Sequence, residues 1–203
     1  MAAESLVLLA TAAGLGLLLA VPVGPIGLLC LRRSLTLGAR AGMAVGLGAA
    51  TADAIYAGIA AFAMGAAAPF IAESSWLGIA GGTVLVAIGL RDIRHRHAPV
   101  SPPTLHGHAG AYAGTVLLTL TNPATVLTFA AIIVGLGLVP DLVSIYDRLV
   151  FVAGVFVGST AWWIVLSTAG GHLGRRLPPH AIGWTRRVAG GAFIAFGVYA
   201  IVG

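Results

Sequence analysis

Charged side chains are scarce in this 203-residue chain, at 8% of the sequence against about 25% in soluble domains. Lysine is absent, so arginine carries all of the positive side-chain charge outside histidine, whereas hydrophobic residues make up 59%. Too few polar residues remain to cover a water-facing surface, which excludes a soluble globular domain. The apolar runs are long and do not alternate in short strands. They therefore predict membrane-spanning helices and exclude an outer-membrane barrel.

Other absences narrow the function. Cys30 is the single cysteine, so an intrachain disulfide is excluded. The sequence has no His-Glu-x-x-His, Gly-x-Ser-x-Gly or Walker motif, so we expect no enzyme, no cofactor and no catalytic metal. The net charge of +5 does not indicate a nucleic-acid partner, because the arginines lie at the ends of apolar runs, as membrane anchors do. The first apolar run contains Glu4 and no basic residue, which predicts a permanent helix rather than a signal peptide.

Six apolar segments have the length of a membrane-spanning helix, which needs roughly 17 to 25 residues. They lie at about 6–31, 41–64, 76–90, 111–139, 149–169 and 188–202. The first and the fourth are interrupted by proline near mid-length. The predicted fold class is therefore an all-α integral membrane protein with six transmembrane helices.

Arginine is distributed unevenly between the connections of these spans. Ten of the eleven arginines fall on one side of the membrane: Arg32, Arg33, Arg40, Arg91, Arg94, Arg96, Arg175, Arg176, Arg186 and Arg187. The other side has Arg148 together with four acidic residues, Glu4, Glu73, Asp141 and Asp147. Cytoplasmic loops carry the excess of basic residues. We therefore expect a multi-pass protein of the bacterial inner membrane with both termini in the periplasm.

The two halves of the sequence resemble each other. Residues 1–90 and 111–203 each supply three spans, and a cytoplasmic linker rich in proline and histidine, 91–110, separates them. Gly-x-x-x-Gly occurs in the second span of each half, at Gly42/Gly46 and Gly154/Gly158. An odd number of spans per half makes the second half inverted relative to the first, a pattern typical of secondary transporters. Chance similarity between glycine-rich helices is the alternative, and the glycine pairs serve equally as helix contacts or as a dimer face.

Both proline interruptions are suited to a binding site. In Pro22-Val23-Gly24-Pro25, Pro25 fits the first position of a restarted helix. In Thr121-Asn122-Pro123, Asn122 is a good N-cap and the proline again fits the first position. A half-helix that begins inside the membrane directs free N–H groups and a partial positive charge into the break, where a carboxylate binds favourably. The alternatives are a simple proline kink and an asparagine that caps only its own helix.

Asp53 is the one carboxylate well inside an apolar span, and no arginine lies at a similar depth. Charge burial in a membrane costs several kcal/mol, so such residues usually mark an ion or proton path. Asp53 is predicted to take up a proton during transport or to pair with a substrate ammonium group. The alternative is a protonated aspartate that holds helices together. The predicted substrate-binding residues are Pro22, Gly24, Pro25, Asp53, Thr121, Asn122 and Pro123.

Aromatic and histidine residues are weaker candidates. Trp162 and Trp163 lie in the middle of the fifth span, where they would pack or contact a cation with their ring faces. Two His-x-His pairs lie in the linker, and imidazole binds transition metals. Histidines in such linkers are more often simply solvated, so we predict no metal site.

These motifs resemble the LysE/RhtB family of amino-acid exporters. The matching residues are Pro22-Val23-Gly24-Pro25-Ile26-Gly27, Arg32-Arg33, Gly38-Ala39-Arg40-Ala41-Gly42, Gly46-Leu47-Gly48, Asp53 and Asn122-Pro123. The resemblance implies efflux of a basic or neutral amino acid, or a related small solute, driven by the proton gradient. It implies the lipid bilayer as a partner and leaves a homodimer open.

Three alternatives belong to other classes. An exporter of metal or inorganic ions of the same superfamily would need more ligands inside the spans than Asp53, Asn122 and Thr121 supply. A passive channel would share the broken helices. A membrane assembly factor would use Asp53 and the breaks structurally and move no solute.

Overall fold

The protein is described by a computed structural model that covers residues 2–21, 25–72, 75–94, 107–122, 125, 128–129, 142, 144–173, 191, 194–195, 198–199 and 201–202. These residues form six helices and no strand, so the predicted all-α class is confirmed for them. The helices are α1 (Ala2–Ala20), α2 (Pro25–Leu37), α3 (Ala39–Ala72), α4 (Ser75–Arg94), α5 (Gly107–Leu120) and α7 (Ile145–Leu173). Most of the predicted sixth span lies outside the described residues.

The first predicted span is divided between two helices. α1 ends at Ala20 and α2 begins at Pro25, a position where proline loses no intrahelical hydrogen bond. Residues 22–24, with Pro22 and Gly24, lie outside the described part. A glycine with φ of 86°, Gly38, then turns the chain from α2 into α3. Such a positive φ is readily adopted only by glycine.

The described helices extend beyond the predicted apolar spans. α3 continues past residue 64 to Ala72, and α7 covers Ile145–Leu173 instead of 149–169. α4 and α5 both reach into the predicted linker 91–110, of which residues 95–106 lie outside the described part. Hydropathy marks the hydrocarbon depth, whereas a helix continues into the interface as long as its ends are capped. At the start of α7, Ser144 Oγ accepts a hydrogen bond from the Asp147 N–H at 3.0 Å and forms such a cap.

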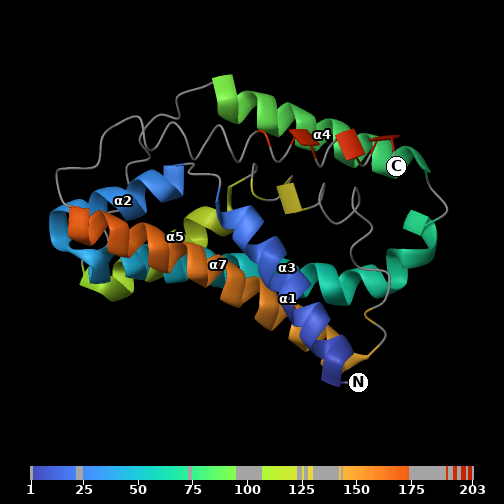
Figure 1. Ribbon diagram of the computed structural model, residues 1–203, viewed down its shortest axis with the longest axis horizontal. Helices are drawn as coiled ribbons and strands as arrows, with labels where there is room; N and C mark the ends of the chain where they lie inside the picture. Colours follow the sequence, from blue (N-terminus) through green and yellow to red (C-terminus); the bar gives the residue numbers. More distant parts are fainter. Residues whose placement is uncertain are drawn as a thin grey trace.

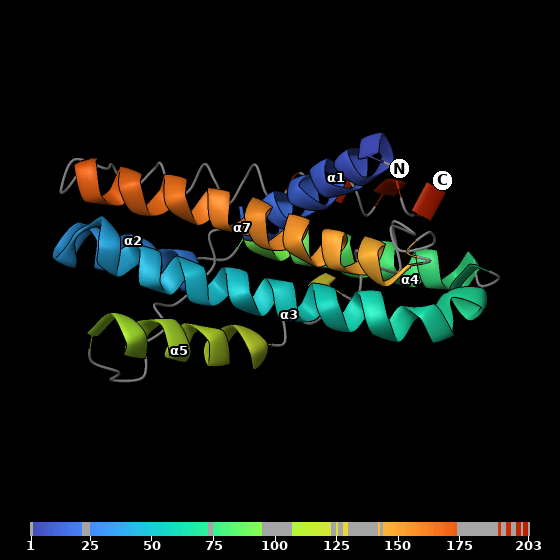
Figure 2. The same ribbon diagram turned by 90° about the horizontal axis from the view of Figure 1, so that it is seen from below.

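Two long helices, α3 and α7, form the centre of the described structure (Figure 1). They pack antiparallel: Gly46 meets Trp163, whereas Gly58, further along α3, meets Val152 near the start of α7. Figure 2 shows α3 between α7 and α5, with α1 crossing α7. The first half of each predicted broken helix thus packs on the long helix of the other half of the sequence, α1 on α7 and α5 on α3.

Glycines allow these helices to approach closely. Gly158 on α7 faces the backbone carbonyl of Ala13 on α1, and Gly16 on α1 faces the backbone carbonyl of Val155. On the other side, Gly48 lies where an added Cβ would stand 2.5 Å from the Tyr112 carbonyl oxygen of α5. Small residues at helix crossings let backbones pack against each other in membranes. The Gly154/Gly158 pair therefore packs against α1 of the same chain.

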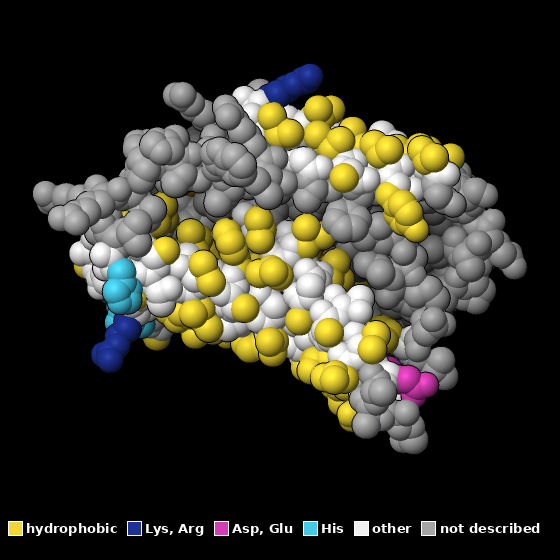
Figure 3. All heavy atoms as spheres, viewed as in Figure 1, with side chains coloured by type: hydrophobic (Ala, Val, Ile, Leu, Met, Phe, Trp, Pro, Cys, Tyr) yellow, Lys and Arg dark blue, Asp and Glu magenta, His cyan; other side chains and the backbone are white. Residues whose placement is uncertain are grey.

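The outer surface is apolar. Leu6, Leu117 and Val165 are each more than half exposed, at 66%, 63% and 57%. In Figure 3 hydrophobic side chains cover much of the described face. Acidic side-chain atoms lie near the N-terminus, histidine and a basic side chain lie at the opposite end, and another basic side chain protrudes at the top edge. Two described helices, Ala39–Phe62 and Ile145–His172, are long and apolar enough to cross a membrane. An apolar belt with charged ends is the surface that a bilayer requires.

Candidate functional site

The central feature between α3 and α7 is a buried hydrogen-bonded group of three side chains. Asp53 is 6% exposed, and its Oδ2 accepts a hydrogen bond from the hydroxyl of Ser159 at 2.7 Å. Ser159 Oγ in turn accepts a hydrogen bond from the indole Nε1–H of Trp163 at 3.2 Å. We call these three residues the Asp53 triad. It joins the two long helices at mid-length, one from each half of the sequence.

Donor chemistry fixes the direction of these hydrogen bonds. An indole Nε1–H can only donate, so the Ser159 oxygen accepts from Trp163 and directs its own hydrogen to Asp53. Within the part of the chain that the structure describes, a neutral hydroxyl and no arginine donates to the carboxylate. Protonation of Asp53 at Oδ2 would require the Ser159 hydroxyl to turn away, because two hydrogens cannot occupy one hydrogen bond. A proton at Asp53 Oδ2 on α3 would thus change the orientation of the Ser159 hydroxyl on α7.

The local sequence explains why these side chains meet. Gly46 and Asp53 are seven residues apart and lie on one face of α3, and Ser159 and Trp163 are four apart on one face of α7. Gly46 has no side chain, and a Cβ there would collide with the Cβ of Trp163. Ala49 and Ala50, which are buried between them, keep the interface thin. Small residues on α3 therefore bring the Trp163 indole within reach of Ser159.

The end of α5 lies beside the triad. Tyr56, one turn after Asp53 on α3, donates a hydrogen bond from its hydroxyl to the Leu120 carbonyl at 2.7 Å. Leu120 is the last residue of α5, directly before the predicted break at Thr121-Asn122-Pro123. The Tyr56 ring also packs on Phe129, with ring centroids 5.2 Å apart. Tyr56 therefore fixes the end of α5 one helical turn from Asp53.

The end of α1 lies at a similar depth. Ala20, the last residue of α1, is buried in the same hydrophobic cluster as Ala49, Ala50 and Trp163. α1 and α5, the first halves of the two predicted broken helices, therefore both end close to the level of the triad along α3.

The structure places the predicted site residues unevenly. Pro25 begins α2, but Pro22, Gly24 and Pro123 lie outside the described residues. Thr121 is exposed, and its hydroxyl donates to the Leu117 carbonyl of its own helix at 2.8 Å. The Asn122 carbonyl accepts a hydrogen bond from the Thr125 N–H at 3.0 Å, as it would at the start of a new turn. Asp53, by contrast, is buried and its side chain is hydrogen-bonded to a side chain of α7.

Ser159 was not predicted from the sequence. The signal was weak: a serine four residues before a tryptophan in an apolar span is common, and helix spacing alone does not say which helix faces it. The two tryptophans differ as well. Trp163 is 4% exposed and hydrogen-bonded, whereas the buried Nε1 of Trp162 has no hydrogen-bond partner within the described residues.

The chain matches the LysE type translocator family over residues 17–203. It belongs to that family. A protein of Bacillus subtilis (strain 168) named "Putative amino acid efflux protein YcgF" is 25% identical over 191 residues, which cover 91% of this translocator and 90% of that protein. No solved structure matches the chain. The protein is thus a membrane transport protein of an exporter family, and its family consists of transporters rather than enzymes.

Replacing Ser159 with alanine is expected to slow transport by this translocator about tenfold. The change removes the hydroxyl that Asp53 and Trp163 share, and an unsatisfied buried polar group costs about 1–3 kcal/mol. Initial transport rates in vesicles measure the effect. Ser167→Ala is the matched control, because Ser167 is equally buried but its hydroxyl donates to carbonyls of its own helix, those of Trp163 and Ile164. Equal rates for both variants would contradict a role for the triad.

A second pair of variants separates the two tryptophans. Trp163→Phe keeps an aromatic ring but removes the donor to Ser159, and one such hydrogen bond is worth about 1 kcal/mol. We expect a fall in transport rate of about fivefold. Trp162→Phe removes no hydrogen bond to a described residue, so its rate should stay within about twofold of the wild type. A larger fall in transport rate for Trp162→Phe than for Trp163→Phe would contradict the role given to the Trp163 indole.

Proposed function

We propose that this LysE-type translocator exports an amino acid, or a related small solute, from the cytoplasm in exchange for a proton. The observation that carries the proposal is the Asp53 triad, a buried carboxylate between two long helices at the level where α1 and α5 end. Buried ionisable residues in membranes mark proton and substrate paths. The name of the Bacillus subtilis relative, an amino acid efflux protein, supports the choice of substrate.

The proposed architecture is a pair of inverted three-helix repeats in the bacterial inner membrane, with both termini in the periplasm. The packing of α1 on α7 and of α5 on α3 supports it, because this exchange is what two interlocked repeats would produce. The arginine bias supports the orientation, since ten of the eleven arginines fall on one side.

In the proposed cycle, Asp53 takes up a proton from the periplasmic side and releases it to the cytoplasm. The substrate carboxylate binds at the restarted half-helices predicted to begin at Pro25 and after Asn122, because the partial positive charge at a helix N-terminus attracts an anion. The substrate ammonium group faces Asp53 until protonation neutralises the carboxylate and favours release outward. Where the proton binds Oδ2, the Ser159 hydroxyl must turn away, and the α3–α7 interface then changes at the same step. Rocking of one repeat against the other then alternates access.

The test uses inside-out vesicles that contain the purified protein, because they convert export into uptake. With an acidic lumen, we expect accumulation of a labelled neutral or basic amino acid that stops when a protonophore dissipates the gradient. Uptake that merely equilibrates and ignores the proton gradient would indicate a passive channel. Folded protein that moves metal ions but no amino acid would support the ion-exporter alternative instead.

A further inference from the structure

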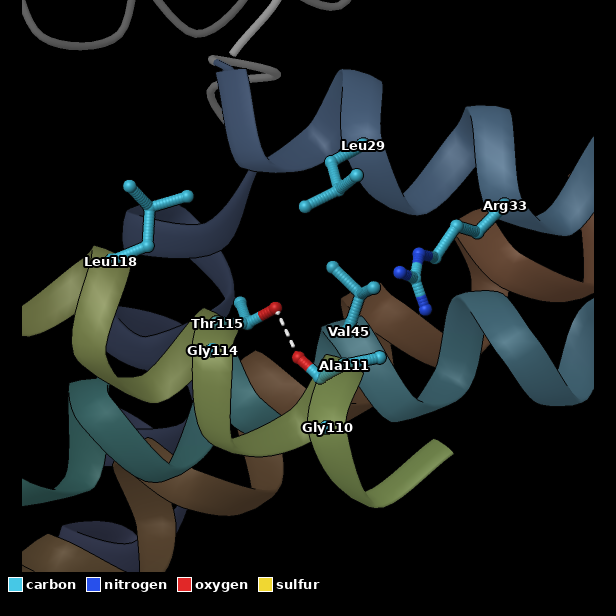
Figure 4. Close-up of a pocket in the computed structure, with 8 residues that line it drawn as sticks. All are labelled: Leu29, Arg33, Val45, Gly110, Ala111, Gly114, Thr115 and Leu118. Atoms are coloured by element: carbon cyan, nitrogen blue, oxygen red, sulfur yellow. Dashed lines mark hydrogen bonds between the residues drawn. The ribbon is translucent and has the colours of Figure 1, made fainter. Parts of the chain in front are cut away.

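A narrow pocket opens between the predicted cytoplasmic halves of the two broken helices. Its empty space of about 230 Å³ includes the solvent at its mouth, and the enclosed part has room for about one water molecule. A larger solute therefore enters only when α2 and α5 separate. Figure 4 shows its walls on three helices, α2, α3 and α5. The lining residues are small or aliphatic apart from one arginine and one threonine: Leu29, Arg33, Val45, Gly110, Ala111, Gly114, Thr115 and Leu118.

Arg33 is the only cation of this lining, and its side chain is less exposed than those of the nearby arginines. In Figure 4 its guanidinium group extends from α2 toward Val45 and Ala111. Its side chain is half-buried, whereas those of Arg32 and Arg40 on the same side of the membrane are exposed. A membrane anchor would extend into the headgroup region and water. The Arg33 guanidinium group therefore lines the pocket, where it is placed to meet an anion.

The remaining lining is small and apolar beside that charge, so its chemistry suits an apolar side chain once α2 and α5 separate. Gly110 and Gly114 carry no side chains, and the Thr115 hydroxyl is already bonded to the Ala111 carbonyl at 2.7 Å. The lining contains no carboxylate that would attract a second ammonium group. A guanidinium group binds a carboxylate with two parallel hydrogen bonds, which adds geometric selectivity to charge.

The pocket also leads toward the proposed substrate site. Leu29 lies one helical turn after Pro25, and Leu118 lies one turn before Asn122. The pocket therefore extends from Arg33 along the inner halves of both broken helices toward their breaks. A solute that leaves the cytoplasm would pass Arg33 before it reached Asp53.

We propose that this pocket is the cytoplasmic loading site of the translocator, where Arg33 binds the carboxylate of a small neutral amino acid with an apolar side chain. The inference rests on the proposed export function and narrows its substrate class. Basic amino acids are disfavoured, because their side-chain cation would meet Arg33 and an inner face rich in arginine. Neutral amino acids bring a carboxylate to Arg33 and no such repulsion.

The first experiment measures L-valine uptake into inside-out vesicles for Arg33→Gln, Arg32→Gln and Arg40→Gln. We expect Arg33→Gln to raise KM about tenfold and to leave kcat within about twofold, since a charge-assisted contact used in loading is lost. The two controls remove the same charge from the same side but from exposed positions, and their KM should stay within about twofold. An unchanged KM in Arg33→Gln would overturn the inference while uptake by the wild type still supported export.

A binding measurement makes the test independent of transport. L-valine should raise the apparent Tm of the purified wild type, whereas valinamide, which lacks the carboxylate, and L-lysine should raise it much less. Arg33→Gln should lose the valine effect, and Arg32→Gln should keep it. A wild type that does not respond to valine overturns the loading site. A valine response that depends on Arg33, in a protein that moves no amino acid, would retain the site and reject export.

An anionic lipid headgroup offers similar chemistry to Arg33, and lipid composition separates the two. The KM effect of Arg33→Gln should be the same in vesicles of phosphatidylcholine alone and in vesicles that also contain phosphatidylglycerol. An effect seen only with phosphatidylglycerol would assign the pocket to a lipid phosphate and overturn the proposal.

Discussion

Replacing Asp53 with asparagine is expected to reduce proton-driven amino-acid uptake to the level of vesicles without the protein. The amide has nearly the same shape, and its carbonyl oxygen still accepts the hydrogen bond from Ser159. It cannot carry a negative charge or exchange a proton at any accessible pH. The variant should therefore fold normally, with an apparent Tm close to that of the wild type, and fail only in transport.

Substrate exchange without a proton gradient distinguishes the two proposed roles of Asp53. If Asp53 only carries the proton, Asp53→Asn retains exchange of labelled for unlabelled amino acid; if it also binds the substrate ammonium group, exchange is lost as well. Asp147→Asn removes the same charge at the exposed start of α7 and should keep nearly full uptake. Normal gradient-driven uptake by Asp53→Asn across pH would reject Asp53 as the coupling residue.

Replacing Gly158 with alanine is expected to displace α1 from α7. An added Cβ would collide with the backbone carbonyl and Cα of Ala13, and backbone atoms cannot rotate away as a side chain can. Overpacking of this kind costs about 1–3 kcal/mol, and each kcal/mol corresponds to about 2–4 °C for a protein of this size. We expect an apparent Tm lower by about 5 °C and a marked loss of uptake, because the end of α1 lies at the level of the Asp53 triad.

Gly14→Ala is the control for this crossing. Gly14 lies on the same helix one residue from Ala13, and an added Cβ there has no neighbour within 4 Å. Alanine also has the higher helix propensity, so the apparent Tm should stay the same or rise slightly. Equal Tm values for both variants would show that the α1–α7 contact does not depend on a missing side chain at residue 158.

Composition and order along the chain were sufficient to predict much of this translocator. The low charge and the long apolar runs predicted helices, and Asp53 is a predicted site residue because a lone carboxylate in an apolar span is costly wherever that span packs. Helix ends were predicted less well: α3 continues to Ala72 and α7 begins at Ile145. Hydropathy does not report where capping extends a helix past the hydrocarbon.

Partners across helices depend on how the helices pack. Ser159 and Asp53 are 106 residues apart, and the sequence does not show which face of α7 meets α3. The same holds for Arg33, whose sequence context is that of any membrane anchor, whereas in the structure α5 contributes to a pocket that Arg33 lines. The helical class, the membrane environment and the lone carboxylate in an apolar span can be derived from the order of residues, because each follows from the cost of placing polar groups in hydrocarbon. Packing of the helices was needed to show that a serine and a tryptophan lie beside that carboxylate and that Arg33 lines a pocket, because helix rotation and crossing are set by close packing of small residues from distant segments.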